Sequence, residues 1–297
     1  EIASRRAVAA RARLPDSSRL QRNVLVGGKA AASNQRGKLQ SSSSSSSGLP
    51  REPEELRMSQ ASDRVKREWQ LRVEAEYKSA AFAHNLVLWI IQLGLSPDLI
   101  RDGLRVVADE LEHAEMSHKV HVAAGGQGMP VLDGSALGIP RNPRIPLELD
   151  LVRWGTRLCL GETVAVRLFA HLRNGCTVSI ARDALERILR DEARHRQFGW
   201  DLLELLLELP TARQVREALT AGLPSVFSDL ECSYGDRANP VPSQFEEEDR
   251  AWGLAPPEEY ARVFDETFEK DFRPRFAALG IDAHPAWATR REEARGL

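Results

Sequence analysis

The stretch Asp109-Glu110-Leu111-Glu112-His113 occurs again 82 residues later as Asp191-Glu192-Ala193-Arg194-His195. Both stretches have the pattern D-E-x-x-H. Residues three apart lie on one face of an α-helix, so each Glu–His pair can ligate one metal ion or bridge two. The repeat therefore predicts two helices that each present a carboxylate and an imidazole to a shared interior.

Apolar residues around both copies recur at helical spacing and place the Glu and His side chains on the buried stripe of each helix. In the second copy this stripe consists of Ile188, Glu192, His195, Gly199, Leu202 and Leu206. A carboxylate and an imidazole on a buried stripe are costly unless they are paired or bound to metal. The pattern favours a metal site; the alternatives are surface-facing charges or a bundle that has lost its metal.

Two further helical segments supply one inward carboxylate each. Glu76 lies 34 residues before Glu110, and Glu162 lies 30 residues before Glu192. Counted from the turns that join the helices, the members of each pair lie at about the same level. Glu74 is the alternative to Glu76, but the apolar stripe favours Glu76. The predicted metal ligands are Glu76, Glu110, His113, Glu162, Glu192 and His195.

The helical segments themselves predict an all-α protein. Short turns follow the first and third of four segments, and a long Gly- and Pro-rich connection separates the second from the third. This order is typical of a four-helix bundle with one long crossover, which is the ferritin-like topology. The four predicted segments are 60–94, 97–123, 148–173 and 179–209, followed by helical stretches at 211–221, 223–234 and 257–278.

Composition divides the chain into three parts. We expect residues 1–57, rich in Arg and Ser, to be a disordered tail, because that composition cannot form a packed core. The bundle is expected at 58–209, and a C-terminal helical extension with an acidic linker at 210–297. Residues 285–297 are expected to be frayed.

Charge and hydropathy exclude several classes of partner. Residues 1–50 carry a net charge of +7 and residues 51–297 a net charge of −9, so the folded part is acidic and we expect no nucleic-acid binding. No stretch reaches the roughly 18 apolar residues that a membrane span needs. The three cysteines form no C-x-x-C pair, which favours a reducing compartment, the cytoplasm.

The order Glu, Glu-x-x-His, Glu, Glu-x-x-His over about residues 65–208 resembles the ferritin-like di-iron carboxylate superfamily. The resemblance implies two bound Fe ions, with Mn or a mixed Mn/Fe pair as alternatives. The form D-E-x-R-H in the second copy is similar to that of di-iron hydroxylases and N-oxygenases, and implies that Asp109, Asp191 and Arg194 orient the ligands. Ile188 and Val166 replace a His and a Thr typical of these two subfamilies, so the resemblance stops at the superfamily.

The resemblance implies an oxidoreductase, namely an oxidase or oxygenase that activates O₂ to oxidise or hydroxylate a small organic substrate. The substrate would lie in an apolar pocket lined by Phe169 and covered by the C-terminal helices. No reductase module is visible, so a separate reductase or ferredoxin is expected to supply electrons, and a homodimer is compatible with the resemblance. The alternatives are a non-catalytic protein that handles iron and a helical interaction module with a vestigial site.

Overall fold

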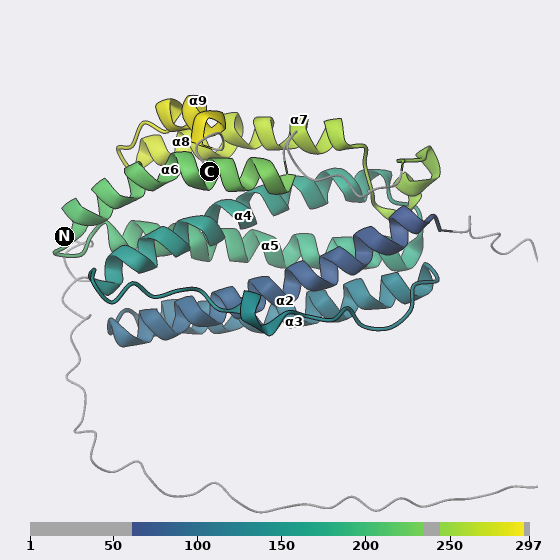
Figure 1. Ribbon diagram of the computed structural model, residues 1–297, viewed down its shortest axis with the longest axis horizontal. Coiled ribbons are helices and arrows are strands. Elements are labelled where there is room, and N and C mark those ends of the chain that lie inside the picture. Colours follow the sequence, from purple (N-terminus) through teal and green to yellow (C-terminus); the bar gives the residue numbers. More distant parts are fainter. Residues whose placement is uncertain (1–60, 235–243, 294–297) are drawn as a thin grey trace, which may run out of the picture. The chain divides into compact units, whose positions relative to one another are not determined.

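The computed structural model describes residues 61–234 and 244–293, and all regular secondary structure in these two ranges is helical (Figure 1). The predicted all-α class is therefore confirmed. The tail predicted at 1–57 lies outside the described residues. None of the helices in the described ranges is long and apolar enough to cross a membrane.

The first two long helices form an antiparallel hairpin. Helix α2 spans Asp63–Gln92 and α3 spans Pro97–Ala123. The turn between them contains Gly94 at φ 65°, a left-handed conformation that glycine adopts without steric cost. The Ser96 hydroxyl accepts a hydrogen bond from the Asp98 N–H, and proline occupies the first helical position, as the sequence predicts.

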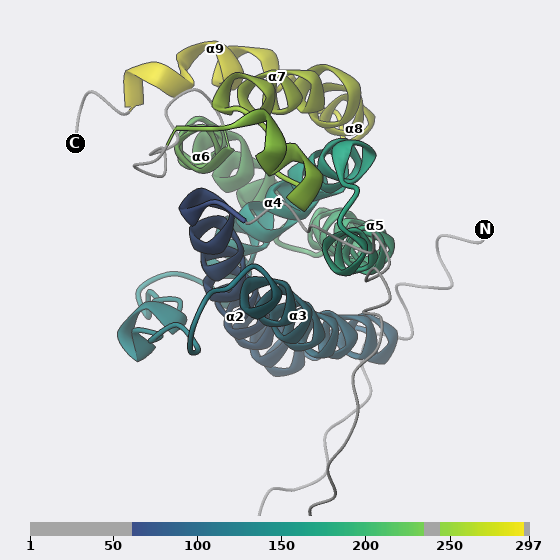
Figure 2. The ribbon, with the colours of Figure 1, turned by 90° about the vertical axis from the view of Figure 1, so that its right-hand side faces the viewer.

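The second hairpin consists of α4 (Leu147–Gly175) and α5 (Ser179–Leu206). The long connection from α3 to α4 contains only one short 3₁₀ turn, η2 (Gly134–Leu137). Helix α3 packs against α5, and α2 packs against α4, so the two hairpins close into a four-helix bundle. The end-on view shows these four helices around one interior (Figure 2).

The C-terminal helices form a further layer over α4, on the side away from α3 (Figures 1 and 2). Helices α6 and α7 contact α4 directly, and α9 packs on α6. This layer shares the larger of two apolar cores with the bundle. Its elements are α6 (Ala212–Tyr234), η3 (Glu247–Trp252), α7 (Pro257–Thr267), η4 (Phe268–Phe272), α8 (Arg273–Ala278) and α9 (His284–Glu293).

Three details of this layer differ from the sequence predictions. Helix α6 continues through Pro224, because its buried residues hold it against the bundle on both sides of the proline. The helix predicted at 257–278 contains a π-helical turn, η4, between α7 and α8. The expected frayed end is helical up to Glu293, because Trp287 stacks on Phe268 at 4.2 Å between ring centroids.

The acidic linker is also more ordered than predicted where the structure describes it. Asp249 in η3 is buried and accepts a hydrogen bond of 2.6 Å from the hydroxyl of Ser62, the N-cap residue of α2. Trp252, at the end of the same turn, is buried and accepts a hydrogen bond from Trp69 through its carbonyl. The linker residues Asp249 and Trp252 therefore position the first turns of α2. Residues 235–243 of the linker lie outside the described ranges.

The bundle interior contains two apolar clusters, which sit toward opposite ends of the helices. One includes Val65 and Trp69 of α2 with Leu172 of α4. The other includes Leu86 of α2 and Leu202 of α5, together with the C-terminal layer. Buried charged side chains lie between the two clusters on all four helices of the bundle, and this polar layer contains the candidate site.

Candidate metal centre

All six predicted metal ligands are buried side chains that face the bundle interior. Helix α2 supplies Glu76, α4 supplies Glu162, and α3 and α5 each supply one Glu–His pair. The residues exposed least are Glu110, His113, Glu192 and His195, each at 2 % or below. The periodicity that places these residues on inward stripes therefore agrees with the observed burial.

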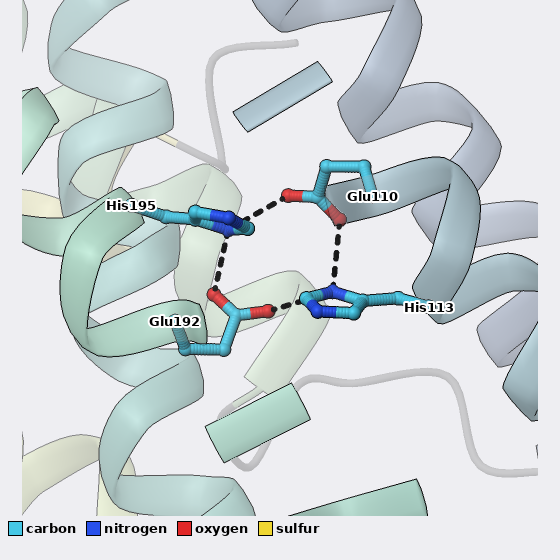
Figure 3. A group of neighbouring side chains, drawn as sticks. All are labelled: Glu110, His113, Glu192 and His195. Carbon is cyan, nitrogen blue, oxygen red and sulfur yellow. Dashed lines mark ion pairs between the residues drawn. The ribbon is translucent and has the colours of Figure 1, made fainter. Parts of the chain in front are cut away.

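The two Glu–His pairs form a closed ring in which carboxylates and imidazoles alternate (Figure 3). The Nδ1 atom of His113 lies 3.5 Å from Glu110 and 3.7 Å from Glu192. The Nδ1 atom of His195 lies 3.3 Å from Glu110 and 3.6 Å from Glu192. Each carboxylate thus faces both imidazoles, and one ligand atom from each of the four residues lies within 4.8 Å of the others.

Several polar atoms in this ring are buried and have no hydrogen-bond partner. They are Glu110 Oε2, His113 Nδ1, Glu192 Oε2 and His195 Nδ1. Buried polar atoms in folded proteins are nearly always hydrogen-bonded, and leaving one unsatisfied costs about 1–3 kcal/mol. Four such atoms converging on one space fit a metal ion, which accepts lone pairs from both oxygen and nitrogen.

An aspartate from the other motif copy lies beside each imidazole. His113 Nε2 lies 3.2 Å from Asp191 Oδ2, and His195 Nε2 lies 3.3 Å from Asp109 Oδ2. A carboxylate at this position accepts a hydrogen bond from the Nε2–H group, which keeps the proton on Nε2 and leaves the Nδ1 lone pair free for a metal. The aspartates therefore orient the two histidines crosswise between α3 and α5.

Two arginines hold this pair of aspartates. Arg194 donates to both Asp109, at 3.1 Å, and Asp191, at 2.5 Å. Arg187 donates to Asp191 at 2.6 Å and to Glu112 at 2.9 Å. Hydrogen bonds from the Arg187 guanidinium, from His113 and from Arg194 overcome the effect of burial and lower the pKa of Asp191. Asp191 is thus held in its ionised form, the form that accepts from an imidazole.

The remaining carboxylates lie at the side of the ring that faces α2 and α4. The Ser79 hydroxyl lies 2.9 Å from Glu110 Oε1 and 3.2 Å from Glu162 Oε1, so it connects both hairpins. Burial, followed by repulsion from Glu110, raises the pKa of Glu76 well above its ordinary value. Glu74, the alternative to Glu76, is partly exposed and pairs with Arg67 at 3.8 Å. The structure therefore brings Glu76 to the site and leaves Glu74 outside it.

The pKa shifts at the site reflect an excess of negative charge. Burial and the charge of Glu162 raise the pKa of Glu192, and burial and the charge of Glu110 raise that of Glu162. Burial opposes protonation of His195, but the proximity of Glu110, 3.3 Å from Nδ1, and the charges of Glu162 and Glu110 raise its pKa to about 9. A bound cation would relieve this repulsion.

A cavity of about 630 Å³ opens beside the glutamates. Glu76, Glu110, Glu162 and Glu192 all line it, as does Phe169, which the sequence predicts to line a pocket. Residues of α6 and of the start of α7 line it as well. The cluster is therefore accessible from the cavity through its carboxylates.

Residues that sequence reasoning missed include Ser79, Arg187 and Tyr234. Ser79 lies three residues after Glu76, and Arg187 lies four residues before Asp191, so both share a helix face with a predicted residue. Tyr234, at the end of α6, lines the cavity, and burial raises its pKa. Helical spacing could have identified Ser79 and Arg187, but it gives no indication of Tyr234.

Histidines that the sequence places away from the ligand faces have other contacts. His121 Nδ1 lies 2.8 Å from the Lys66 carbonyl, and His171 pairs with Glu259.

Comparison of the chain with protein-family models, with curated proteins and with solved structures gives no match. The functional argument therefore rests on the site itself.

Proposed function

We propose that this chain is a ferritin-like di-iron oxidoreductase, an oxidase or oxygenase that acts on a small organic substrate. The observation that carries this proposal is the ring of four buried ligand residues whose unpaired atoms converge, extended by two further glutamates at an open cavity. Four Glu and two His form the donor set that bundle proteins use for two iron or manganese ions. When bound, two such ions would supply the electrons that reduce O₂.

The protein's own residues have distinct parts in this proposal. His113 and His195 would hold one metal each, and Glu110 and Glu192 would contact both, because each carboxylate faces both imidazoles. Glu76 and Glu162 would complete the set on the cavity side. The apolar cavity walls would keep bulk water from the reacting substrate.

The main test measures metal content and O₂ uptake in the same preparations. Freshly purified full-length protein is expected to contain two Fe ions per chain, or Mn in one or both positions. After anaerobic reduction it should consume O₂. In this assay a chemical reductant replaces the separate reductase or ferredoxin that we expect to supply electrons in the cell. We expect the protein to be located in the cytoplasm. Elemental analysis and an oxygen electrode give the two readings.

Matched variants separate the site from the rest of the helix. Glu110→Ala should lose both metals, because this carboxylate faces both imidazoles. Glu115→Ala, an exposed change on the same helix, should retain metal and O₂ uptake. Metal without O₂ uptake would support a non-catalytic iron-handling protein instead. Absence of metal from the wild type would support a helical interaction module with a vestigial site.

A further inference from the structure

The cavity beside the glutamates is elongated along the bundle. It is lined by α2 from Arg64 to Phe82, a rise of about 27 Å, and by α4 from Arg157 to Leu172, about 22 Å. Ser79 of α2 lies beside Glu162 of α4, so the glutamates lie between the two ends of the cavity. A ligand in this space would therefore extend to both sides of the candidate metal centre.

Most of the cavity wall is apolar. The apolar side chains that line it include Leu71, Phe82, Leu158, Ala165, Leu168 and Phe169. Burial of apolar ligand surface against such a wall contributes about 25 cal/mol per Å². A volume of about 630 Å³ falls within the range of small-molecule sites. The wall thus fits a hydrocarbon chain or ring system of moderate size.

Arg72, which also lines the cavity, has a buried donor with no acceptor. Its Nη2 donates to the Gly253 carbonyl at 2.8 Å, and its guanidinium carbon lies 4.2 Å from the centre of the Trp69 ring. Its Nη1 is buried and has no hydrogen-bond partner in the protein. The guanidinium is always charged, so an anionic ligand oxygen would satisfy this donor with a charge-assisted hydrogen bond.

Of the other basic side chains at the cavity, Lys78 is exposed, and the two arginines have acidic partners. Arg64 pairs with Glu68 at 3.5 Å, and Arg157 pairs with Asp229 at 2.8 Å. Tyr260 also lines the cavity, and its side chain interacts with that of Arg72. Among the described residues, Arg72 has no acidic partner, so an anionic head group is favoured beside its guanidinium.

Gly161 keeps space open next to Glu162. It lies inside α4 and lines the cavity, and a Cβ added there would meet no atom within 4 Å. Glycine inside a helix costs about 0.5–1 kcal/mol relative to alanine, and at this position no steric contact requires it. Gly161 therefore leaves open space in the cavity beside Glu162.

From these observations we propose that the cavity binds an apolar organic carboxylate as the substrate class of this site. The carboxylate head binds Arg72, and the carbon skeleton runs along α2 and α4 past Gly161, which places a carbon of the chain beside the glutamate cluster. The assignment rests on the proposed oxidoreductase function for its catalytic meaning. The binding mode itself depends only on the cavity and on Arg72.

Decanoate is a suitable probe, with decanol and decylamine as matched molecules that differ in the head group. Isothermal titration calorimetry on the full-length protein should show saturable binding of decanoate with one site per chain. Decanol and decylamine should bind at least about tenfold more weakly, because neither offers an anionic oxygen to Arg72. Equal affinity for all three probes would overturn the assignment of the head group.

Two pairs of variants locate the probe in the cavity. Arg72→Gln should weaken decanoate binding at least about tenfold, and Arg67→Gln, a change at an exposed arginine on the same helix, should leave it unchanged. Gly161→Leu should abolish binding by filling the cavity, and Gly161→Ala should retain it. Circular dichroism verifies that each variant is folded.

The outcomes separate this inference from the proposed function. Metal and O₂ uptake without decanoate binding would reject the substrate class and leave the oxidoreductase standing. Decanoate binding that requires Arg72 and the space at Gly161, in a protein without metal, would retain the binding site and reject the oxidoreductase. Binding that is unchanged in both Arg72→Gln and Gly161→Leu places the probe elsewhere and overturns the inference.

Discussion

Asp109 and Asp191 determine which nitrogen of each histidine faces the interior of the site. Each aspartate accepts from the Nε2 of the histidine that belongs to the other motif copy. The Nδ1 atoms then point into the ring with their lone pairs unpaired. Loss of the negative charge on one aspartate would make its histidine less basic and less well oriented, without removing a ligand.

Asp191→Asn should therefore weaken metal binding by about 10–100-fold while the helices remain intact. Competition against a chromophoric chelator measures the affinity, and circular dichroism measures the helix content. Asp183→Asn, an exposed change on the same helix, serves as the control and should bind metal as the wild type does. An unchanged affinity in Asp191→Asn would show that the aspartate does not orient His113.

Helical spacing was sufficient to predict the inward residues but not their partners. The stripes on α3 and α5 identify the Glu–His pairs because burial within one helix depends on local periodicity. The crossed Asp–His contacts depend on how α3 and α5 are aligned against each other, which spacing within either helix does not encode. Ser79 is similar, since its contact with Glu162 is made between α2 and α4.

At the scale of the element, two glycines in helix interiors have opposite surroundings. Nothing lies within 4 Å of a Cβ added at Gly161, whereas a Cβ at Gly199 would meet the Cα of Cys159 at 2.6 Å. Gly199 therefore allows α5 to approach the backbone of α4. Gly161 has no such packing role.

Gly161→Ala should stabilise the protein by about 0.5–1 kcal/mol, because alanine favours the helix and meets no obstacle. Gly199→Ala should destabilise it by about 1–3 kcal/mol, because the backbone of α4 must move. Urea denaturation followed by circular dichroism measures both changes. A destabilised Gly161→Ala variant would contradict the open space that the structure shows at this position.

Helix α7 is attached to the rest of the fold through Glu259. Hydrogen bonds from Arg250 and His171 lower the pKa of Glu259 below its ordinary value of 4.5. A carboxylate whose pKa is lower in the folded state contributes stability above the unfolded pKa, and this contribution is lost as the pH falls through the folded pKa. The two contacts connect α7 with η3 and with α4.

Glu259→Gln should therefore lower the melting temperature at about pH 7, and the difference from the wild type should shrink as the pH falls below about 4.5. Thermal unfolding followed across this pH range measures the difference. Glu258→Gln is the matched control, since Glu258 is exposed. A difference that stays constant with pH would rule out the ionised form of Glu259 as its source.

At the scale of the whole molecule, a layer of buried charge separates two apolar clusters. Burial of the two apolar clusters stabilises the folded state. The polar layer between them opposes folding, because it contains unpaired polar atoms and carboxylates that repel one another. The stability of the folded protein should therefore depend on what neutralises this layer. A ligand that binds only the folded state stabilises it by mass action.

Removal of metal with a chelator should lower the melting temperature. At a free metal concentration 100 times the dissociation constant, binding stabilises the fold by about 2.7 kcal/mol, or very roughly 5–10 °C for a domain of this size. Differential scanning calorimetry with and without chelator measures the shift. The Glu110→Ala variant should show no shift, and an equal shift in that variant would point to metal bound elsewhere.

The crossed Asp–His contacts also affect the order in which the protein assembles. A hairpin of α2 and α3 contains His113 but not Asp191, and a hairpin of α4 and α5 contains His195 but not Asp109. Each half alone offers an ion one Glu–His pair and one further glutamate, with an imidazole that lacks its aspartate partner. High-affinity capture of a metal ion at this site would therefore be a late event in folding, and metal content would report whether the two halves of the bundle have docked in the correct alignment.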